Sequence, residues 1–272
     1  MKTILILTSD DKNQSIYLIY AIAERWKNSG HKVILHRGVK NIPDADIVIL
    51  HVDQTFIKDN YLRFLSRFPI VLNRNVTDIS KVIISNNILK KDENYSGPVI
   101  VKTNANFGGL PEATKISRLY SNIVSKWNCG MVTVLNPDAY PVFESKDKVP
   151  NIVWQNKNLI VEKFLPEKKD GLFYLRYWIF LGEKGWAGRF GANEPIVKFS
   201  KMVTKDEDVS VPEELKIVRK KLGFDYGRFD YVEHHGKTVL LDVNKTLGGR
   251  HHLDAYSARL DILAEGINNF FI

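Results

Sequence analysis

The stretch from residue 226 to residue 249, YGRFDYVEHHGKTVLLDVNKTLGG, constrains the fold of this chain more than any other. Two alternating apolar runs flank a turn at Gly236, which predicts an antiparallel hairpin. Because strand side chains alternate between two faces, Asp242 and Asn244 share one face, and Asp230 on the partner strand can reach it. Two carboxylates and an amide oxygen at one hairpin suit a hard cation such as Mg²⁺. The alternative is the polar outer face of an ordinary hairpin.

The same residues resemble a known signature. GRFD followed by LLDVN and a glycine turn is similar to the C-terminal motif of the ATP-grasp superfamily, the fold of D-alanine:D-alanine ligase, glutathione synthetase and related carboxylate–amine ligases. The resemblance implies an ATP-grasp fold in which Asp230, Asp242 and Asn244 hold two Mg²⁺ ions on the phosphates of ATP. The chain departs from the commonest form with Asp rather than Glu at position 242 and with Leu247 where a proline usually follows. Neither departure removes an oxygen ligand.

Composition excludes several classes of protein. The 272 residues can bury a large core, the single cysteine excludes an internal disulfide, and no apolar run approaches the roughly 20 residues that span a bilayer. The first residues turn acidic too soon for a signal peptide, so we expect a cytoplasmic protein with no membrane partner. Lys and Arg outnumber Asp and Glu by 39 to 31 but are dispersed, which favours a phosphate-bearing small ligand over nucleic acid.

The first 85 residues alternate between strand and helix patterns. Strands are expected at 4–8, 33–36, 46–52 and 69–73, and helices at 13–27 and 60–67. Such alternation implies a parallel sheet, so we expect an α/β protein with a Rossmann-like N-terminal lobe. No GxGxxG follows the first strand, which disfavours a dinucleotide-binding enzyme. The expected lobes are 1–85, a central lobe at 86–165 with a glycine-rich loop, and a C-terminal lobe at 166–272 with the metal site.

A predicted strand at 98–103 ends with a lysine and is followed by a glycine pair. Lys102 could hold an anionic phosphate while the backbone N–H groups of Gly108 and Gly109 cover it. The alternative is a surface lysine beside a turn. In the ATP-grasp family a strand lysine contacts the ATP phosphates and a mobile glycine-rich loop closes over them, and the resemblance gives these roles to Lys102 and the glycine pair.

The run LIVEKFLPE at 159–167 resembles the hinge of these ligases, where backbone groups pair with adenine and flanking side chains reach the base. The matching positions are Glu162, Lys163, Phe164 and Leu165. A hinge suits adenine because an apolar slot buries the ring while main-chain groups read its edge. The alternative is a strand with an exposed salt-bridging pair. Glu167 and Asp170 are both candidates for the ribose hydroxyls.

Basic residues are expected at the transferred phosphoryl group. The family places an arginine on the strand at 173–181, which corresponds to Arg176, although a surface arginine is the alternative. Lys198 could reach the same anion. Arg228, together with Arg176, would stabilise the transferring phosphoryl group and the later tetrahedral oxyanion. The Arg-His-His at 250–252 is expected to line the substrate end of the cleft, with solvent exposure as the alternative.

The resemblance implies a function. It is that of an ADP-forming ligase that activates a substrate carboxylate as an acylphosphate and joins it to an amine. The expected cofactors are ATP and Mg²⁺, and the expected partners are a small-molecule carboxylate and amine; a homodimer is a habit of the family. Two alternatives stay open: an ATP-grasp kinase that phosphorylates a small-molecule acceptor, and a non-catalytic ATP-binding module.

Overall fold

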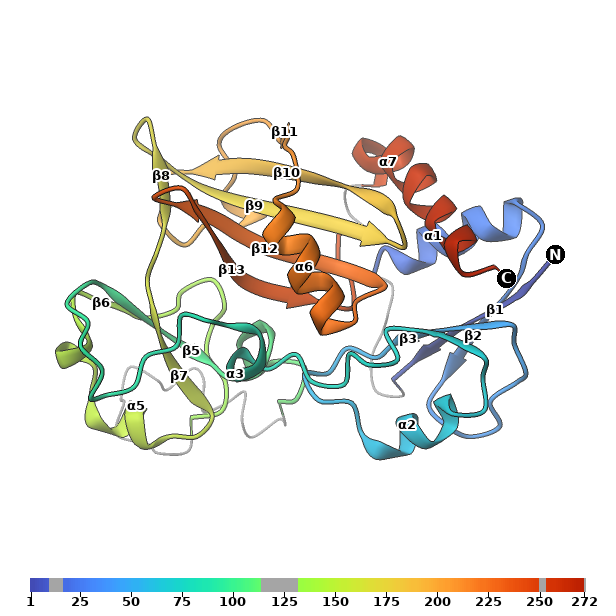
Figure 1. Ribbon diagram of the computed structural model, residues 1–272, viewed down its shortest axis with the longest axis horizontal. Coiled ribbons are helices and arrows are strands. Elements are labelled where there is room, and N and C mark those ends of the chain that lie inside the picture. The colour runs from blue at the N-terminus through green and yellow to red at the C-terminus, as the bar shows by residue number, and fades with distance from the viewer. Residues whose placement is uncertain (10–16, 114–131, 250–252, 272) are drawn as a thin grey trace.

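The computed structural model describes residues 1–9, 17–113, 132–249 and 253–271, which form three β-sheets that follow one another along the sequence (Figure 1). The Arg-His-His at 250–252 lies outside the described residues. In the described part, no helix is both long and apolar enough to cross a membrane.

The first sheet has four parallel strands in the order β2-β1-β3-β4. Its strands are β1 (Thr3–Thr8), β2 (Lys32–Arg37), β3 (Ile47–His51) and β4 (Ile70–Leu72), and its helices are α1 (Ile19–Asn28) and α2 (Asp59–Leu65). Ile4 and Ile6 of β1 pack in the same cluster as α1. Leu5 and Leu7 point the other way and pack with α2. The two helices therefore cover opposite faces, which explains why β1 and β3 are apolar at successive positions.

The second sheet is antiparallel and has three strands in the order β6-β5-β7. Its elements are β5 (Val99–Thr103), β6 (Val142–Phe143), β7 (Leu159–Lys163), α5 (Asn151–Gln155) and the 3₁₀ helices η1 (Phe107–Gly109) and η2 (Lys146–Lys148). The short helix α3 (Lys81–Ile84) lies in the segment between the first two sheets. In Figure 1 this sheet and α3 lie below the larger third sheet, on the side away from the chain termini.

The third sheet has six antiparallel strands, with β11-β10-β9-β12-β13 in order and β8 on the edge of β9. Its strands are β8 (Glu167–Lys169), β9 (Leu172–Leu181), β10 (Lys184–Ala192), β11 (Glu207–Asp208), β12 (Tyr226–His234) and β13 (Lys237–Asn244). The remaining helices are η3 (Phe199–Lys201), α6 (Glu213–Leu222), α7 (Leu253–Glu265) and η5 (Gly266–Phe270). Helix α6 covers one face through a core around Trp178, Phe180 and Phe229. It ends at Gly223, whose φ of 72° is the left-handed conformation that favours glycine at a helix end.

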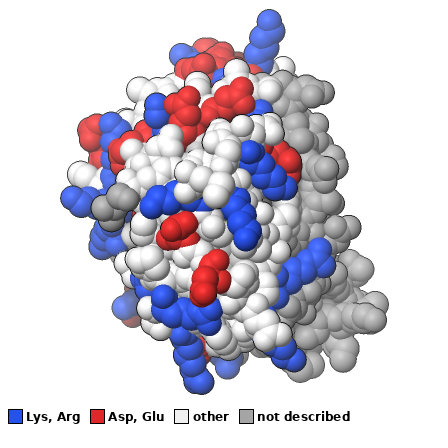
Figure 2. Space-filling model, turned by 90° about the vertical axis from the view of Figure 1, so that its right-hand side faces the viewer, with Lys and Arg blue, Asp and Glu red and all other residues white. Residues whose placement is uncertain are grey.

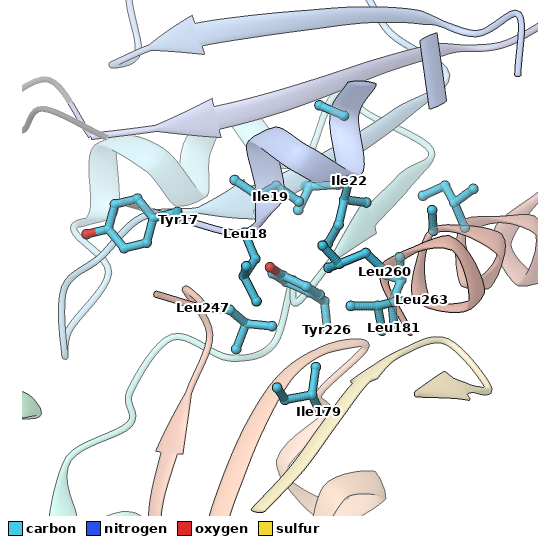
Figure 3. Packing of buried hydrophobic residues seen from close by; sticks show 14 of the residues in the cluster. Tyr17, Leu18, Ile19, Ile22, Ile179, Leu181, Tyr226, Leu247, Leu260 and Leu263 are labelled. Carbon is cyan, nitrogen blue, oxygen red and sulfur yellow. The ribbon is translucent and has the colours of Figure 1, made fainter. Parts of the chain in front are cut away.

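A single apolar core joins the first sheet to the third (Figure 3). Leu18 and Ile22 of the α1 segment point toward Tyr226 and toward Leu260 and Leu263 of α7. The buried indole of Trp26 donates a hydrogen bond of 2.8 Å to the Ala264 carbonyl. The first and last helices therefore share one interior.

A polar clamp fixes the start of β12 to the first sheet. Asn73, the buried residue after β4, donates from Nδ2 to the Tyr226 carbonyl at 2.8 Å. Its Oδ1 accepts from the backbone N–H groups of Asp225 at 2.9 Å and of Tyr226 at 3.1 Å. Its own N–H donates to the Asp225 carboxylate at 2.7 Å. The strand that carries Arg228 and Asp230 is thereby placed relative to the N-terminal sheet.

Charged side chains do not segregate by sign on the face in Figure 2, where basic and acidic groups are interspersed. On this face the basic excess is not concentrated into a single patch, as the dispersed sequence positions of Lys and Arg led us to expect.

Candidate functional site

The candidate site starts from the register of the β12–β13 hairpin. Arg228 pairs with Asn244 and Asp230 with Asp242, so all four side chains belong to one face. Asn244 Nδ2 lies 3.5 Å from Asp230 Oδ2. Phe229 and its neighbours on the other face pack into the α6 core. The prediction that Asp230, Asp242 and Asn244 share a face is confirmed.

Each of the two carboxylates has a cation of the chain beside it. Arg228 Nε is 2.6 Å from Asp230 Oδ1, and Lys81 Nζ is 2.5 Å from Asp242 Oδ1. Asn106, which follows β5, donates from Nδ2 to Asn244 Oδ1 at 3.1 Å. Lys81 and Asn106 were not expected from the sequence. They come from loops and helix ends more than 130 residues away from their partners, where no periodic pattern marks them.

The cluster is tightly coupled electrostatically. Burial raises the pKa of the Asp230 carboxyl, the Arg228 guanidinium opposes that rise, and the nearby Asp242 carboxylate adds to it. Two negative charges are thus held close together in a partly desolvated place, which favours a cation between them.

The second sheet contributes a buried lysine–glutamate ion pair. Lys102 on β5 and Glu162 on β7 form an ion pair of 2.7 Å, with both side chains buried. Lys198 is close enough to groups on both sheets to interact with their charges. Burial lowers the pKa of its ammonium, and the positive charge of Lys102 lowers it further. The carboxylates of Asp138, Asp242 and Asp230 act in the opposite direction and raise it. Lys102 is therefore not a surface lysine. Lys102 of the second sheet, Asp230 and Asp242 of the third sheet and the loop residue Asp138 all act electrostatically on Lys198.

The glycine pair after β5 is buried and has left-handed backbone, with φ of 66° at Gly108 and 74° at Gly109. A Cβ on Gly108 would lie 2.1 Å from the Leu135 carbonyl oxygen, and one on Gly109 would lie 2.4 Å from the Thr133 carbonyl oxygen. Glycine is required here because two backbone segments approach without room for a side chain.

The expected hinge begins at Glu162, the partner of Lys102. Glu162 is buried, contrary to the alternative of an exposed pair, and its Oε1 has no hydrogen-bond partner in the part of the chain that the structure describes. The N–H groups of Lys163 and Phe164 donate to the carbonyls of Asn87 and Pro98, both at 2.9 Å. Those two donors are engaged, so reading the edge of a base would fall to other groups, such as the backbone of Leu165.

Comparisons with known proteins agree with this geometry. No protein-family model matches the chain, and no curated protein matches its sequence. Solved structures that match nearly the whole chain include a RimK domain protein ATP-grasp from Sphaerobacter thermophilus (12% identity, TM-score 0.53, 97% of this chain and 99% of that one), D-alanine–D-alanine ligase from Bacillus anthracis (16%, 0.52, 99% and 98%), and macrocyclase MdnC from Microcystis aeruginosa bound with precursor peptide MdnA (12%, 0.56, 98% and 99%). The chain has the ATP-grasp fold. This confirms the fold that GRFD and LLDVN predicted.

The ATP-grasp fold does not bring Arg176 to the cluster. Its guanidinium forms a bidentate pair with Glu167, with Nε to Oε2 and Nη2 to Oε1 both at 2.8 Å, and Nη2 also lies 3.0 Å from Glu233 Oε2. Because side chains alternate along β9, Arg176 shares the face of Trp178 in the α6 core. Tyr177, on the other face, lies under the Arg228 guanidinium at 5.0 Å. Arg176 and the cluster are on opposite faces of the sheet.

The other ribose candidate is also outside the cluster. Asp170 is exposed at the tip of the β8–β9 hairpin, where Asp170 and Gly171 have positive φ values of 50° and 81°. An Asp-Gly pair with this backbone forms the tight turn of a two-residue hairpin. The Nζ of Lys163 lies 3.8 Å from Oε1 of Glu93, in the segment between α3 and β5.

A second polar region of the ATP-grasp fold adjoins the cluster. Lys245, next to Asn244, is 1% exposed, and its Nζ is 3.5 Å from the Val76 carbonyl. Burial lowers its pKa to about 7, against the attraction of Asp53 and other carboxylates. Asp53 in turn accepts hydroxyl hydrogen bonds from Tyr17 at 2.6 Å and Thr246 at 3.0 Å. The loop after β13 is thereby held against the first sheet, a contact that no sequence motif announced.

The donor set fits Mg²⁺ held jointly with phosphate. No group of three or more His, Cys, Asp and Glu side chains that could hold a metal occurs among the described residues. Asp230 and Asp242 nevertheless face one another across the register with the Asn244 amide beside them. Mg²⁺ is commonly bound by one or two carboxylates, with substrate phosphates and water completing the shell. The residues present therefore meet that requirement only when a phosphate ligand is there as well.

Proposed function

We propose that this ATP-grasp chain is an ATP-dependent ligase that activates a carboxylate with the γ-phosphate of ATP and joins it to an amine, with release of ADP. The observation that carries the proposal is the convergence of Asp230, Asp242 and Asn244 with basic side chains from two sheets. Hard oxygen donors next to several cations suit a metal-bound triphosphate.

Residues of the second and third sheets would bind different parts of ATP and its metal ion. ATP would bind as a substrate between the second and third sheets, with its adenine at the hinge 162–165 and its phosphates near Lys102 and Lys198. Asp230 and Asp242, with Asn244, would hold Mg²⁺, which neutralises negative charge on the phosphates. Little covalent chemistry is left to the protein in phosphoryl transfer, so the rate depends on alignment and charge.

Arg228 is the side chain we assign to the reacting groups. It stands on the same face as both carboxylates, with its Nε bonded to Asp230 and its guanidinium over the Tyr177 ring. A guanidinium fixed from two sides is preorganised to stabilise negative charge that develops during transfer. We assign no such role to Arg176, because it lies on the opposite face of the sheet and pairs with Glu167 and Glu233.

We also propose that the sheets are the cores of three lobes, at 1–85, 86–165 and 166–272. The six-stranded sheet contributes the metal ligands, and the three-stranded sheet contributes Lys102 and the hinge. Substrate carboxylate and amine would then enter from the end of β13, where the loop 245–249 meets the first sheet.

The test is ADP release from ATP and Mg²⁺ with paired carboxylates and amines. Free amino acids and peptides both belong in the panel, because macrocyclase MdnC and ATP-grasp ligase PsnB are similar in fold and their structures hold precursor peptides. We expect ADP release that requires both a carboxylate and an amine and that is lost in Asp242→Asn. Hydroxylamine should trap the activated carboxylate as a hydroxamate. ADP formed with a hydroxyl acceptor and no hydroxamate would identify a kinase instead, and nucleotide binding without any turnover would leave a binding module.

A further inference from the structure

Lys81 is a buried lysine held by three parts of the chain. It is the first residue of α3, and its side chain is 3% exposed. Its backbone N–H bonds to the Asn104 carbonyl at 2.9 Å, and the next N–H bonds to Asn104 Oδ1 at 3.1 Å. Its Nζ reaches Asp242 Oδ1 at 2.5 Å and Asn106 Oδ1 at 3.5 Å. The helix start is therefore fixed, and the ammonium is aimed at the candidate metal ligand.

The chain itself engages every oxygen-bearing side chain of the candidate metal site. Asp242 is paired with Lys81, Asp230 with Arg228, and the Asn244 Oδ1 accepts from Asn106. The Asp242 partner comes from the segment between the first and second sheets, whereas Arg228 lies on the hairpin itself and Asn106 follows β5. Its ammonium balances the charge of a carboxylate that is only 28% exposed.

We propose that, in the nucleotide-free protein, Lys81 occupies the place beside Asp242 that a divalent cation takes when nucleotide binds, so that metal and nucleotide enter together. This inference rests on the proposed function, because it takes Asp242 to be a metal ligand. No bond is made or broken in the exchange. One monovalent charge moves away from the carboxylate and one divalent charge replaces it.

The physical reason is charge repulsion in a poorly solvated place. An ammonium 2.5 Å from a carboxylate oxygen and a divalent ion on the same carboxylate would be only a few ångströms apart, and little water separates them. The lysine must leave to another acceptor, and its second neighbour, the Asn106 amide oxygen, is uncharged. A phosphate oxygen is a better acceptor for an ammonium. A metal ion that arrives without nucleotide therefore finds the Asp242 carboxylate already paired with Lys81. When nucleotide is bound, its phosphate oxygens can accept the displaced ammonium.

The test is the affinity of the nucleotide-free full chain for Mn²⁺ alone, measured from the electron paramagnetic resonance signal of free Mn²⁺. Lys81→Met keeps the length of the side chain and removes its charge. We expect Lys81→Met to bind Mn²⁺ about tenfold or more tightly than the unmodified chain, since the carboxylate is no longer neutralised. Lys184→Met is the matched control. Lys184 is the first residue of β10 and pairs with Glu265 of α7, so its replacement should leave Mn²⁺ binding unchanged.

The gain must also depend on the carboxylate. We expect the double variant Lys81→Met with Asp242→Asn to lose it. Unchanged or weaker Mn²⁺ binding in Lys81→Met, or a gain that survives Asp242→Asn, overturns the inference. If none of the proteins binds ATP with Mg²⁺, the proposed function fails; intact nucleotide binding without the gain in Mn²⁺ affinity overturns only the role of Lys81.

Two further measurements keep the inference testable if Lys81→Met does not fold. Lys81→Gln offers a second neutral side chain. In the unmodified chain, the buried ammonium of Lys81 should give a slowly exchanging ¹⁵N–H signal, assigned by its loss in Lys81→Arg. We expect that signal to persist with Mg²⁺ alone and to shift when a non-hydrolysable ATP analogue is added with Mg²⁺. A shift with Mg²⁺ alone refutes the exchange.

Discussion

Replacing Asn73 with alanine should destabilise the protein by about 4 kcal/mol. The change removes the three side-chain hydrogen bonds to Asp225 and Tyr226, each worth about 1 kcal/mol. It also places alanine at a φ of 59°, which costs about 1 kcal/mol more. The free energy of unfolding from urea titration, followed by tryptophan fluorescence, measures the loss.

Two variants separate the terms of this prediction. Asn73→Gly removes the same bonds but tolerates the left-handed backbone, so we expect it to lose about 1 kcal/mol less than alanine. Asn75→Ala changes an exposed asparagine two residues away and should stay within about 0.5 kcal/mol of the unmodified chain. A loss below about 1 kcal/mol in Asn73→Ala would show that the clamp is not a stabilising contact. Equal losses of unfolding free energy in Asn73→Gly and Asn73→Ala would show that the positive φ at this position costs alanine nothing.

Three further predictions concern the site and its surroundings. Arg228→Ala should lower turnover by about 10²- to 10³-fold with ATP affinity nearly unchanged, as measured by steady-state kinetics and nucleotide titration; unchanged turnover would move the arginine out of the site. Arg176→Met leaves the buried Glu167 without its bidentate partner, so it should cost about 3 to 5 kcal/mol of stability while turnover per folded molecule is kept; a large loss of turnover at unchanged stability would instead place Arg176 in the chemistry. Burial lowers the pKa of His51 from 6.5 to about 4, so the unfolded chain binds a proton at this residue at a higher pH than the folded chain does. The contribution of His51 to the free energy of unfolding should therefore be fully present above pH 6.5, and about 3 kcal/mol should be lost as the pH falls through 4. Between pH 6.5 and pH 4, the urea midpoint should fall less steeply in His51→Gln than in the unmodified chain. Parallel pH curves for the two proteins would contradict that account.

The strands were predictable because their side chains repeat with period two over short distances. The expected strand at 98–103 corresponds to β5, and the strand at 173–181 to β9. In the run 159–167, β7 ends at Lys163 and β8 begins at Glu167, with Pro166 between them. Helix α5 was missed because its five residues are too few to show a helical period.

The site was predictable where its parts lie close in sequence. Asp230, Asp242 and Asn244 sit on one hairpin, so alternation alone places them on a common face. Lys81 is 161 residues from Asp242, and only the packing of the sheets brings them together. Arg176 and Tyr177 lie on opposite faces because side chains alternate along β9. The resemblance assigned Arg176 to the transferred phosphoryl group, whereas the register puts it on the face opposite to Asp230 and Asp242.

The shared interior of α1 and α7 affects how the chain folds during synthesis. Leu18, Ile22 and Trp26 emerge from the ribosome well before Leu260 and Leu263, against which they pack. Until then the first sheet exposes one apolar side, which is the kind of surface that promotes aggregation or chaperone capture. A fragment that ends after the first sheet should therefore aggregate on its own. The segment of α1 completes its packing late, although it is made before α7.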